Sequence, residues 1–239
     1  MIDLHCHILP GIDDGALDAD DSVAMARQAA DDGIETVCAT PHIRHDHDVR
    51  IHELEGRVAE LNESLERHRV PVEVVPGGEV AASALGGLDA EELRQVSLGG
   101  GRWILLEPPP GPLGDSLTAA ADELHDAGFG VLIAHPERHP SADLARRLHE
   151  LTGRGALVQV TAAYLAGGTA RQAMLSLAAD GLVHIVASDA HSSHGGRALR
   201  LSEGLAGLEE VDRVRPHLDW IARQAPAAIL AGERPSPPF

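Results

Sequence analysis

Short apolar runs alternate along the chain with segments whose apolar residues recur at helical spacing. Each run is almost continuously apolar, which is typical of a parallel strand buried on both faces. Between the runs, residues 51–65, 113–124 and 144–151 each place their apolar side chains on one helical face. The strand candidates are Ile2–His5, Ile34–Thr40, Val72–Val80, Trp103–Glu107, Phe129–His135, Leu157–Thr161 and Val183–Asp189. This alternation predicts an α/β fold with helical crossovers between parallel strands.

The strand candidates form one uninterrupted series in a chain of 239 residues, with no linker between them. Single α/β barrels commonly have this length, so we expect one barrel domain over residues 1–231 rather than two domains. Residues 232–239 are rich in proline and are expected to form a loose tail.

The chain is strongly acidic, with a formal net charge of −18. This argues against binding to nucleic acid or to an anionic membrane surface, because both require a basic surface. No apolar run approaches the ~18 residues of a membrane-spanning helix, and residues 1–5 lack the pattern of a signal peptide. The two cysteines do not form a disulfide framework. We therefore expect a cytoplasmic protein without membrane insertion, and the oligomeric state stays open.

Histidine and carboxylate side chains recur where the predicted strands end. In a parallel barrel these ends meet on one face, which carries the active site. Two such pairs, in His5-x-His7 and Asp189-x-His191, each point to one side of an extended strand because strand side chains alternate. The candidate metal ligands are His5, His7, Asp14, His42, Glu79, Glu107, His135, Asp189 and His191.

A metal centre explains this convergence better than separate hydrogen-bonded or solvated side chains do. Carboxylates gathered in one place repel each other and lose solvation unless cations accompany them. Mixed imidazole and carboxylate ligands suit zinc, iron or manganese rather than calcium. Nine ligands exceed the need of one ion, so we predict two or three divalent ions with a bridging carboxylate. Paired ions of this kind can clamp both oxygens of a phosphoryl transfer.

Two arginines closely follow strands that supply candidate ligands. Arg138 and Arg197 could each grip a phosphate with a bidentate fork, and the alternative is an ordinary ion pair within a loop. His45 and His47, just past His42, either line the mouth of the site or lie in a solvated loop.

A second phosphatase chemistry is suggested by Cys38 and Arg44, whose spacing matches the C-x5-R loop of cysteine-dependent phosphatases. Pro41 removes one phosphate-binding N–H from that loop, no glycine lies inside it, and His42 already belongs to the metal candidates. Because matches this short recur by chance, we expect Cys38 to be a buried core residue.

Several motifs together resemble the polymerase and histidinol phosphatase (PHP) superfamily, and within it the manganese-dependent bacterial protein tyrosine phosphatases of capsule and exopolysaccharide systems. They are Ile2-Asp-Leu-His-Cys-His with Asp13-Asp-Gly15, Thr40-Pro-His42, Gly78-Glu79, Ala134-His-Pro-Glu-Arg138 and Ala187-Ser-Asp-Ala-His191. The resemblance implies a distorted seven-stranded (β/α) TIM-like barrel that holds three ions. It implies a first ion at His5, His7, Glu79 and Asp189, a second at Glu79, Glu107 and His135 with Glu79 bridging, and a third at Asp14, His42 and His191.

The resemblance also implies that Arg138 and Arg197 bind the substrate phosphate. The loop from His191 to Arg197 is one residue longer than is usual in the family, so Arg200 is an alternative to Arg197. The implied activity is hydrolysis of phosphotyrosine on a bacterial tyrosine kinase of polysaccharide biosynthesis, by a metal-bound hydroxide. Manganese is the expected ion, with iron or zinc as alternatives.

Three other functions stay open at this stage. The first is a small-molecule phosphatase acting on histidinol phosphate or nucleotide phosphates. The second is hydrolysis of C–N bonds in the manner of amidohydrolases, although those enzymes usually carry a carbamylated lysine and this chain has no lysine. The third is a non-catalytic regulatory module that binds metal.

Overall fold

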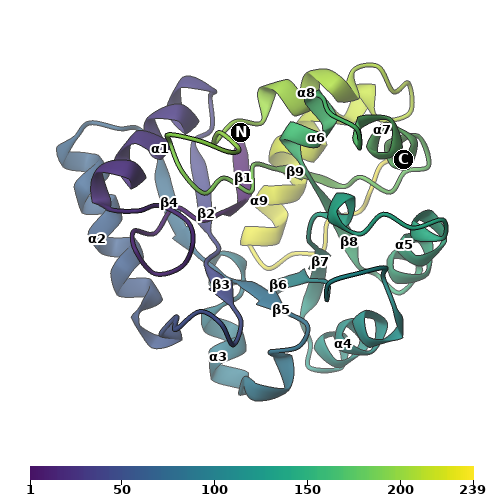
Figure 1. Ribbon diagram of the computed structural model, residues 1–239, viewed down its shortest axis with the longest axis horizontal. Helices are drawn as coiled ribbons and strands as arrows, with labels where there is room; N and C mark the ends of the chain where they lie inside the picture. The colour runs from purple at the N-terminus through teal and green to yellow at the C-terminus, as the bar shows by residue number, and fades with distance from the viewer.

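In the computed structural model, which describes residues 1–239, the strands curl around the centre of the molecule and the helices cover the outside (Figure 1). The strands are β1 (Ile2–Cys6), β2 (Thr36–Ala39), β3 (His42–Ile43), β4 (Glu73–Pro76), β5 (Glu79–Ala81), β6 (Trp103–Glu107), β7 (Gly130–Ile133), β8 (Leu157–Thr161) and β9 (Ile185–Ala187). The α-helices are α1 (Ala19–Asp31), α2 (Leu54–Arg67), α3 (Ala90–Gln95), α4 (Asp115–Asp126), α5 (Leu144–Gly153), α6 (Ala162–Ala166), α7 (Arg171–Ala179), α8 (Ser202–Leu208) and α9 (Ala225–Leu230).

The strands pair in parallel throughout and form two sheets. One has the order β1-β2-β4, and the other the order β3-β5-β6-β7-β8-β9. The prediction of an α/β fold with a parallel sheet is therefore confirmed. The continuous seven-stranded ladder is not confirmed, because the predicted strand Val72–Val80 is divided between the two sheets and the short strand β3, which lies beyond the predicted strand Ile34–Thr40, joins the second sheet.

Both passages from one sheet to the other have a local cause in the sequence. The second predicted strand, Ile34–Thr40, contains β2 and is followed by Pro41, which offers no N–H to a ladder, before β3 begins in the other sheet. The third predicted strand breaks between β4 and β5, at Gly77 and Gly78. A Cβ atom on Gly77 would lie 2.7 Å from Cys38 Sγ, so only glycine allows the backbone to approach this closely.

The first and last strands meet beyond their regular pairing. The Asp189 N–H donates to the His5 carbonyl (2.8 Å), and the His7 N–H donates to the Ala190 carbonyl (2.9 Å). A single parallel bridge links Cys6 with Ala190. Because every strand runs in the same direction, the carboxyl ends of all of them gather at one edge of the curled sheets, and this edge carries the candidate site.

The apolar core has two parts. The larger part lies between the strands and the surrounding helices and includes Ile104, Leu117 and Leu148. The smaller part lies inside the curl, where Leu4, Leu105 and other inward residues pack against α9. Neither part is rich in aromatic side chains, which agrees with an aromatic content of 2%.

The C-terminal tail lies against the opposite end of the strands from the candidate site. Trp103, the first residue of β6, donates its indole N–H to the Glu233 carbonyl (2.7 Å). The Phe239 ring packs edge-on against Trp220, with ring centroids 5.6 Å apart, and stacks near His184. The structure therefore differs from the expectation of a loose tail at Glu233 and Phe239, which make these contacts, whereas residues 236–238 between them are exposed. No helix in the chain is both long enough and apolar enough to cross a membrane.

Candidate metal centre

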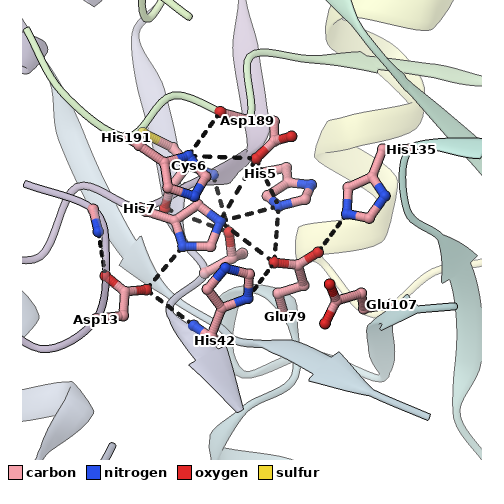
Figure 2. A network of polar contacts seen from close by, with 12 residues as sticks. His5, Cys6, His7, Asp13, His42, Glu79, Glu107, His135, Asp189 and His191 are labelled. Atoms are coloured by element: carbon pink, nitrogen blue, oxygen red, sulfur yellow. Dashed lines mark hydrogen bonds and ion pairs between the residues drawn. The ribbon is translucent and has the colours of Figure 1, made fainter. Parts of the chain in front are cut away.

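All nine residues predicted as metal ligands lie at the carboxyl edge of the strands, and Figure 2 shows His5, His7, His42 and Glu79 facing a common centre. The buried members are His5, His7, His42, Glu79, His135 and Asp189. Glu107 and His191 are half-buried, and the Asp14 side chain is 58% exposed. Four overlapping groups have ligand atoms within 4.8 Å of one another: His7–Asp14–His42–His191, His5–His135–Asp189, His5–His7–Glu79 and His42–Glu79–Glu107.

Glu79, the first residue of β5, lies at the middle of the cluster (Figure 2). Its Oε2 atom is 2.8 Å from His42 Nδ1 and 3.4 Å from the Nε2 atoms of both His5 and His7. Its Oε1 atom is 2.6 Å from His135 Nε2. One carboxylate therefore faces four imidazoles from three chain segments, which is the arrangement expected of a bridging ligand.

The two histidines of β1 are fixed in the tautomer that a metal ligand needs. His5 Nδ1 lies 3.0 Å from Gln159 Oε1, and His7 Nδ1 lies 2.8 Å from Asp13 Oδ2. Since both partners are acceptors, each Nδ1 carries a proton, which leaves Nε2 as the ring atom that can bind an ion. The two Nε2 atoms are 3.3 Å apart and lie 3.6 and 3.7 Å from Asp189 Oδ1. Outer partners of this kind orient metal-binding imidazoles.

A third set of ligand atoms lies beside the first. His42 Nε2 is 3.3 Å from Asp14 Oδ1, and His191 Nε2 is 3.6 Å from the same oxygen. The His7 and His191 rings stack with centroids 3.9 Å apart. This set contains the three residues that the resemblance implies for a third ion.

The second implied set is only partly reproduced. Glu79 and His135 are in contact, but Glu107 groups with His42 and Glu79 instead of with His135. Arg44 Nη1 donates to Glu107 Oε1 at 3.4 Å and draws this carboxylate toward the mouth of the site. His135 in turn groups with His5 and Asp189.

Several buried ligand atoms lack a hydrogen-bond partner, which provides a test of whether cations fit. His42 Nδ1 and Glu79 Oε2 are 2.8 Å apart, yet neither atom has a partner with hydrogen-bond geometry. His135 Nδ1 is also unpartnered. Buried polar atoms left in this way are costly, so their convergence supports a site for ions. The donor set is nitrogen and oxygen only, and it fits divalent manganese, iron or zinc.

The charges of the clustered side chains also support a site for divalent ions. Burial opposes ionisation of Glu79, but the nearby His5, His135 and His42 outweigh it and hold the pKa of Glu79 well below its usual range. Burial likewise lowers the pKa of His7, but hydrogen bonds to Asp13 and Glu79 raise it to about 10. Without an ion the buried carboxylates thus depend on imidazolium protons for balance. A divalent cation would supply that positive charge instead.

The backbone is strained at two of the candidate ligands. His135 has φ 31° and Asp189 has φ 51°, values in the left-handed region that side chains other than glycine seldom adopt. Strain of this kind is tolerated where the surrounding structure enforces it, and it concentrates at functional sites. Here it turns two strand ends so that their side chains face Glu79 and His5.

The two predicted phosphate-binding arginines both border the cluster through Asp189. Arg138 Nη2 donates to Asp189 Oδ2. Arg197 donates from Nε to the Asp189 carbonyl (2.7 Å) and lies 3.1 Å from Asp189 Oδ1 through Nη2. Arg200 instead faces Glu203 at 4.0 Å on the surface. The structure therefore places Arg197, and not Arg200, beside the candidate ligands.

Three further residues belong to the site although the sequence did not single them out for it. Asp13 accepts from His7 Nδ1, from the Gly15 N–H (2.9 Å) and from the His42 N–H (3.0 Å). Gln159 accepts from His5, and Arg44 reaches Glu107. Asp13 stands next to the predicted Asp14 in the motif, but only the loop conformation shows that the two carboxylates play different parts.

The structure also decides between the alternatives that the sequence left for His45, His47 and Cys38. His47 stacks on His42, with ring centroids 5.1 Å apart, so it borders the site, whereas His45 is exposed. Cys38 is fully buried, and burial raises the pKa of its thiol to about 12. Its Sγ donates to the Pro76 carbonyl (3.3 Å). A thiol held in this way cannot act as a thiolate nucleophile, which agrees with the assignment of Cys38 to the core.

The curled parallel sheets and the ligands gathered at their carboxyl edge define an α/β protein with a candidate multi-ion centre. Comparison with known families narrows the class. The model of the capsular polysaccharide synthesis family CpsB/CapC matches residues 1–230. The chain belongs to this family.

Individual relatives agree with the family. The tyrosine-protein phosphatase YwqE of Bacillus subtilis is 37% identical over 199 residues, which cover 80% of this chain and 78% of the relative. The putative tyrosine-protein phosphatase CapC of Staphylococcus aureus is 30% identical over 202 residues, covering 80% and 77%. A chain from the crystal structures of YwqE and of CpsB from Streptococcus pneumoniae, described as unique metal-dependent tyrosine phosphatases, superimposes with a TM-score of 0.86. It is 31% identical, and each chain is covered completely.

A more distant likeness concerns the fold alone. A β-aspartyl dipeptidase from Fervidobacterium islandicum superimposes with a TM-score of 0.62 at 16% identity, covering 96% of this chain and 72% of that one. Identity this low carries no information about substrate.

Proposed function

We propose that this chain is a metal-dependent phosphatase that hydrolyses phosphotyrosine, with a tyrosine kinase of bacterial polysaccharide biosynthesis as its protein substrate. The observation that carries the proposal is the position of Arg138 and Arg197. Both guanidinium groups bind Asp189, which is itself a candidate ligand in contact with His5 and His7. Two groups able to bind a phosphate thus adjoin a cluster of side chains suited to divalent cations. The named activities of YwqE and CapC support the same assignment.

The candidate ligands would hold two or three ions, with His5, His7, Glu79 and Asp189 around the first and Asp14, His42 and His191 around another. Glu79 would bridge toward Glu107 and His135. When bound, the ions would withdraw charge from the phosphoryl oxygens and make water acidic enough to attack at neutral pH. Manganese is the ion we expect, and iron or zinc would also match the nitrogen and oxygen donors.

The arginines would act on the substrate directly. Only Nη2 of Arg138 has a partner, and its side chain is 33% exposed, so Nε and Nη1 stay open to a phosphate. Arg197 donates from Nε to the Asp189 carbonyl, and its Nη2 lies 3.1 Å from both Asp189 Oδ1 and His191 Nδ1, so Nη1 stays open to a phosphate. Together they would neutralise charge that spreads over the phosphoryl oxygens in the transition state. A phenolate leaves with a pKa of ~10, so it needs less protonation than an alkoxide does.

We also infer the finer architecture from these contacts. The bonds that join His5 to Asp189 and His7 to Ala190 support a distorted seven-stranded (β/α) barrel of the PHP type, closed between β1 and β9. Residues 1–231 would form this single domain, with residues 232–239 as its tail. Localisation of the protein in the cytoplasm stays a prediction from the sequence.

The test is release of phosphate from a panel of substrates by chelated protein to which single metals are returned. The panel contains phosphotyrosine peptides, histidinol phosphate and nucleoside monophosphates. We expect phosphotyrosine peptides to be hydrolysed fastest, and only after metal is restored.

Each other result selects another function. Preference for histidinol phosphate or nucleotides would replace the protein substrate by a small molecule. No hydrolysis of any substrate with any metal would favour a regulatory module, and full activity in chelator would refute the metal-dependent mechanism.

A further inference from the structure

The loop that carries Arg197 has almost no backbone support of its own. We define the Arg197 loop as residues 191–199, between β9 and α8. No backbone N–H within it donates to a backbone carbonyl. Its Gly196 adopts φ 73°, which adds freedom next to Arg197. The position of the Arg197 guanidinium therefore depends on side chains that hold the loop from outside.

Those side chains come from one face of helix α1. Asp21 and Gln28 lie seven residues apart in α1, and Asp32, the C-cap of this helix, follows four residues later, so the three side chains point the same way. Asp21 Oδ1 accepts from the N–H (2.8 Å) and the hydroxyl (2.6 Å) of Ser193. Asp32 Oδ2 accepts from the N–H groups of Leu201 (2.7 Å) and Ser202 (3.0 Å), beyond the loop.

Gln28 differs from Asp21 and Asp32 because it binds the loop at two points, on either side of Arg197. Its Nε2 donates to the Ser193 carbonyl (3.0 Å), and its Oε1 accepts from the Leu199 N–H (3.2 Å). The amide can serve in only one orientation, since the reverse would set its NH2 group against the Leu199 N–H. One half-buried side chain thus closes a seven-residue segment, 193–199, that contains Arg197.

We propose that Gln28 is a positioning residue that holds Arg197 in place for the substrate phosphate. The proposal rests on the proposed phosphatase function. With the clamp intact, the Arg197 loop starts from one conformation and the guanidinium stays against Asp189. Without it the loop samples many conformations, and the ordering must be done during catalysis. The loss would fall on kcat more than on KM, because an arginine that stabilises spreading charge acts mainly in the transition state.

The first experiment compares Gln28→Met with Arg27→Met in the manganese-loaded full chain. Methionine keeps the length of Gln28 but removes both hydrogen bonds, whereas Arg27 is the exposed neighbour on the same helix. We expect kcat/KM for a phosphotyrosine peptide to fall roughly tenfold in Gln28→Met and to stay unchanged in Arg27→Met. Hydrogen exchange of residues 192–199 should become faster in Gln28→Met only, with both variants folded by circular dichroism.

The decisive experiment repeats Gln28→Met in an Arg197→Ala background. If Gln28 acts through Arg197, the second substitution should lower kcat/KM less than twofold once Arg197 is gone, because coupled residues are not additive. Gln28→Glu keeps an acceptor for Leu199 but loses the donor to Ser193, so it should fall between wild type and Gln28→Met.

Two results would overturn the proposal. One is a tenfold loss that persists in the Arg197→Ala background, and the other is unchanged hydrogen exchange in the Arg197 loop of Gln28→Met. If the wild type itself hydrolyses no phosphate ester, the proposed function fails. The exchange measurement would still show whether Gln28 holds the loop.

Discussion

Replacing Asp13 by asparagine should weaken metal binding without removing a metal ligand. Asp13 accepts three hydrogen bonds, from His7 Nδ1, from the Gly15 N–H and from the His42 N–H. An amide has one oxygen for these donors, so its NH2 group must face at least one of them. If the amide oxygen takes the place of Oδ2, the NH2 group faces the Gly15 N–H, and His7 Nδ1 is left with an acceptor that carries no negative charge and is pushed out of position. Substitutions of such outer partners typically lower metal affinity 10–100-fold.

The expected loss of metal affinity can be converted into a loss of stability for the metal-bound protein. At a metal concentration of about 100 Kd, binding stabilises the wild type by about 2.7 kcal/mol. A thirtyfold weaker site at the same concentration keeps about 0.9 kcal/mol, a loss of roughly 2 kcal/mol. For a chain of this length that corresponds to a metal-induced rise in Tm smaller by roughly 4–8 °C.

The assay is thermal unfolding of chelated protein with manganese returned in steps, alongside a calorimetric titration. Asp20→Asn, at an exposed position in the first turn of α1, is the matched control and should behave as wild type. Wild-type metal affinity in Asp13→Asn would refute the idea that Asp13 orients His7. A lower Tm in chelator alone, with an unchanged metal response, would make Asp13 a purely structural residue.

The remaining predictions concern the nucleophile, the phosphate clamp and pH. Chelation should abolish aryl phosphate hydrolysis, and manganese should restore it. Cys38→Ser should retain activity. An inactive Cys38→Ser variant that is folded and loaded with metal would contradict the assignment of the thiol to the core. Arg138→Ala should lower kcat/KM about 10²–10³-fold with unchanged metal content, and Arg138→Lys should recover only part of that activity. The surface variant Arg200→Ala should have the kcat/KM of the wild type. Loss of metal from Arg138→Ala would show that Arg138 is structural. Burial lowers the pKa of His184 to about 4, so protonation is disfavoured in the folded state. Its contribution to stability is complete above pH ~6.5 and falls by roughly 3 kcal/mol as the pH drops to ~4. In urea unfolding with chelator present, His184→Asn should lose less stability than wild type over this range, and parallel pH profiles would show that His184 is not responsible.

The strand ends could be located from the sequence because two independent regularities coincide there. Apolar runs locate parallel strands, and ionisable residues at their ends are costly to bury without a shared purpose. His5, His7, Glu79 and Asp189 satisfy both conditions, and the structure brings them together. Predictions of this kind depend on the periodicity of apolar residues and on strand direction, and both can be inferred without knowing the loop conformations.

What could not be predicted depends on loops and on discrete breaks. Asp13 and Asp14 are adjacent, and only the backbone between β1 and α1 decides which carboxylate faces His7. Arg197 and Arg200 were alternatives for the same reason, since the length of the loop leaves its path open. The change of sheet at Pro41, between β2 and β3, was in principle readable, because proline cannot donate to a ladder. The contacts of Phe239 were not, because they join residues distant in sequence.

The position of the C-terminal tail determines what intrinsic fluorescence can report. The chain has two tryptophans, and both contact the tail region: Trp103 binds the Glu233 carbonyl and Trp220 packs against Phe239. Both indoles therefore sense the amino end of the strands, whereas the candidate metal ligands occupy the carboxyl end. A change in emission on adding metal would thus be a remote signal, transmitted along the strands. Emission during denaturation would record release of the tail and could precede loss of the metal centre.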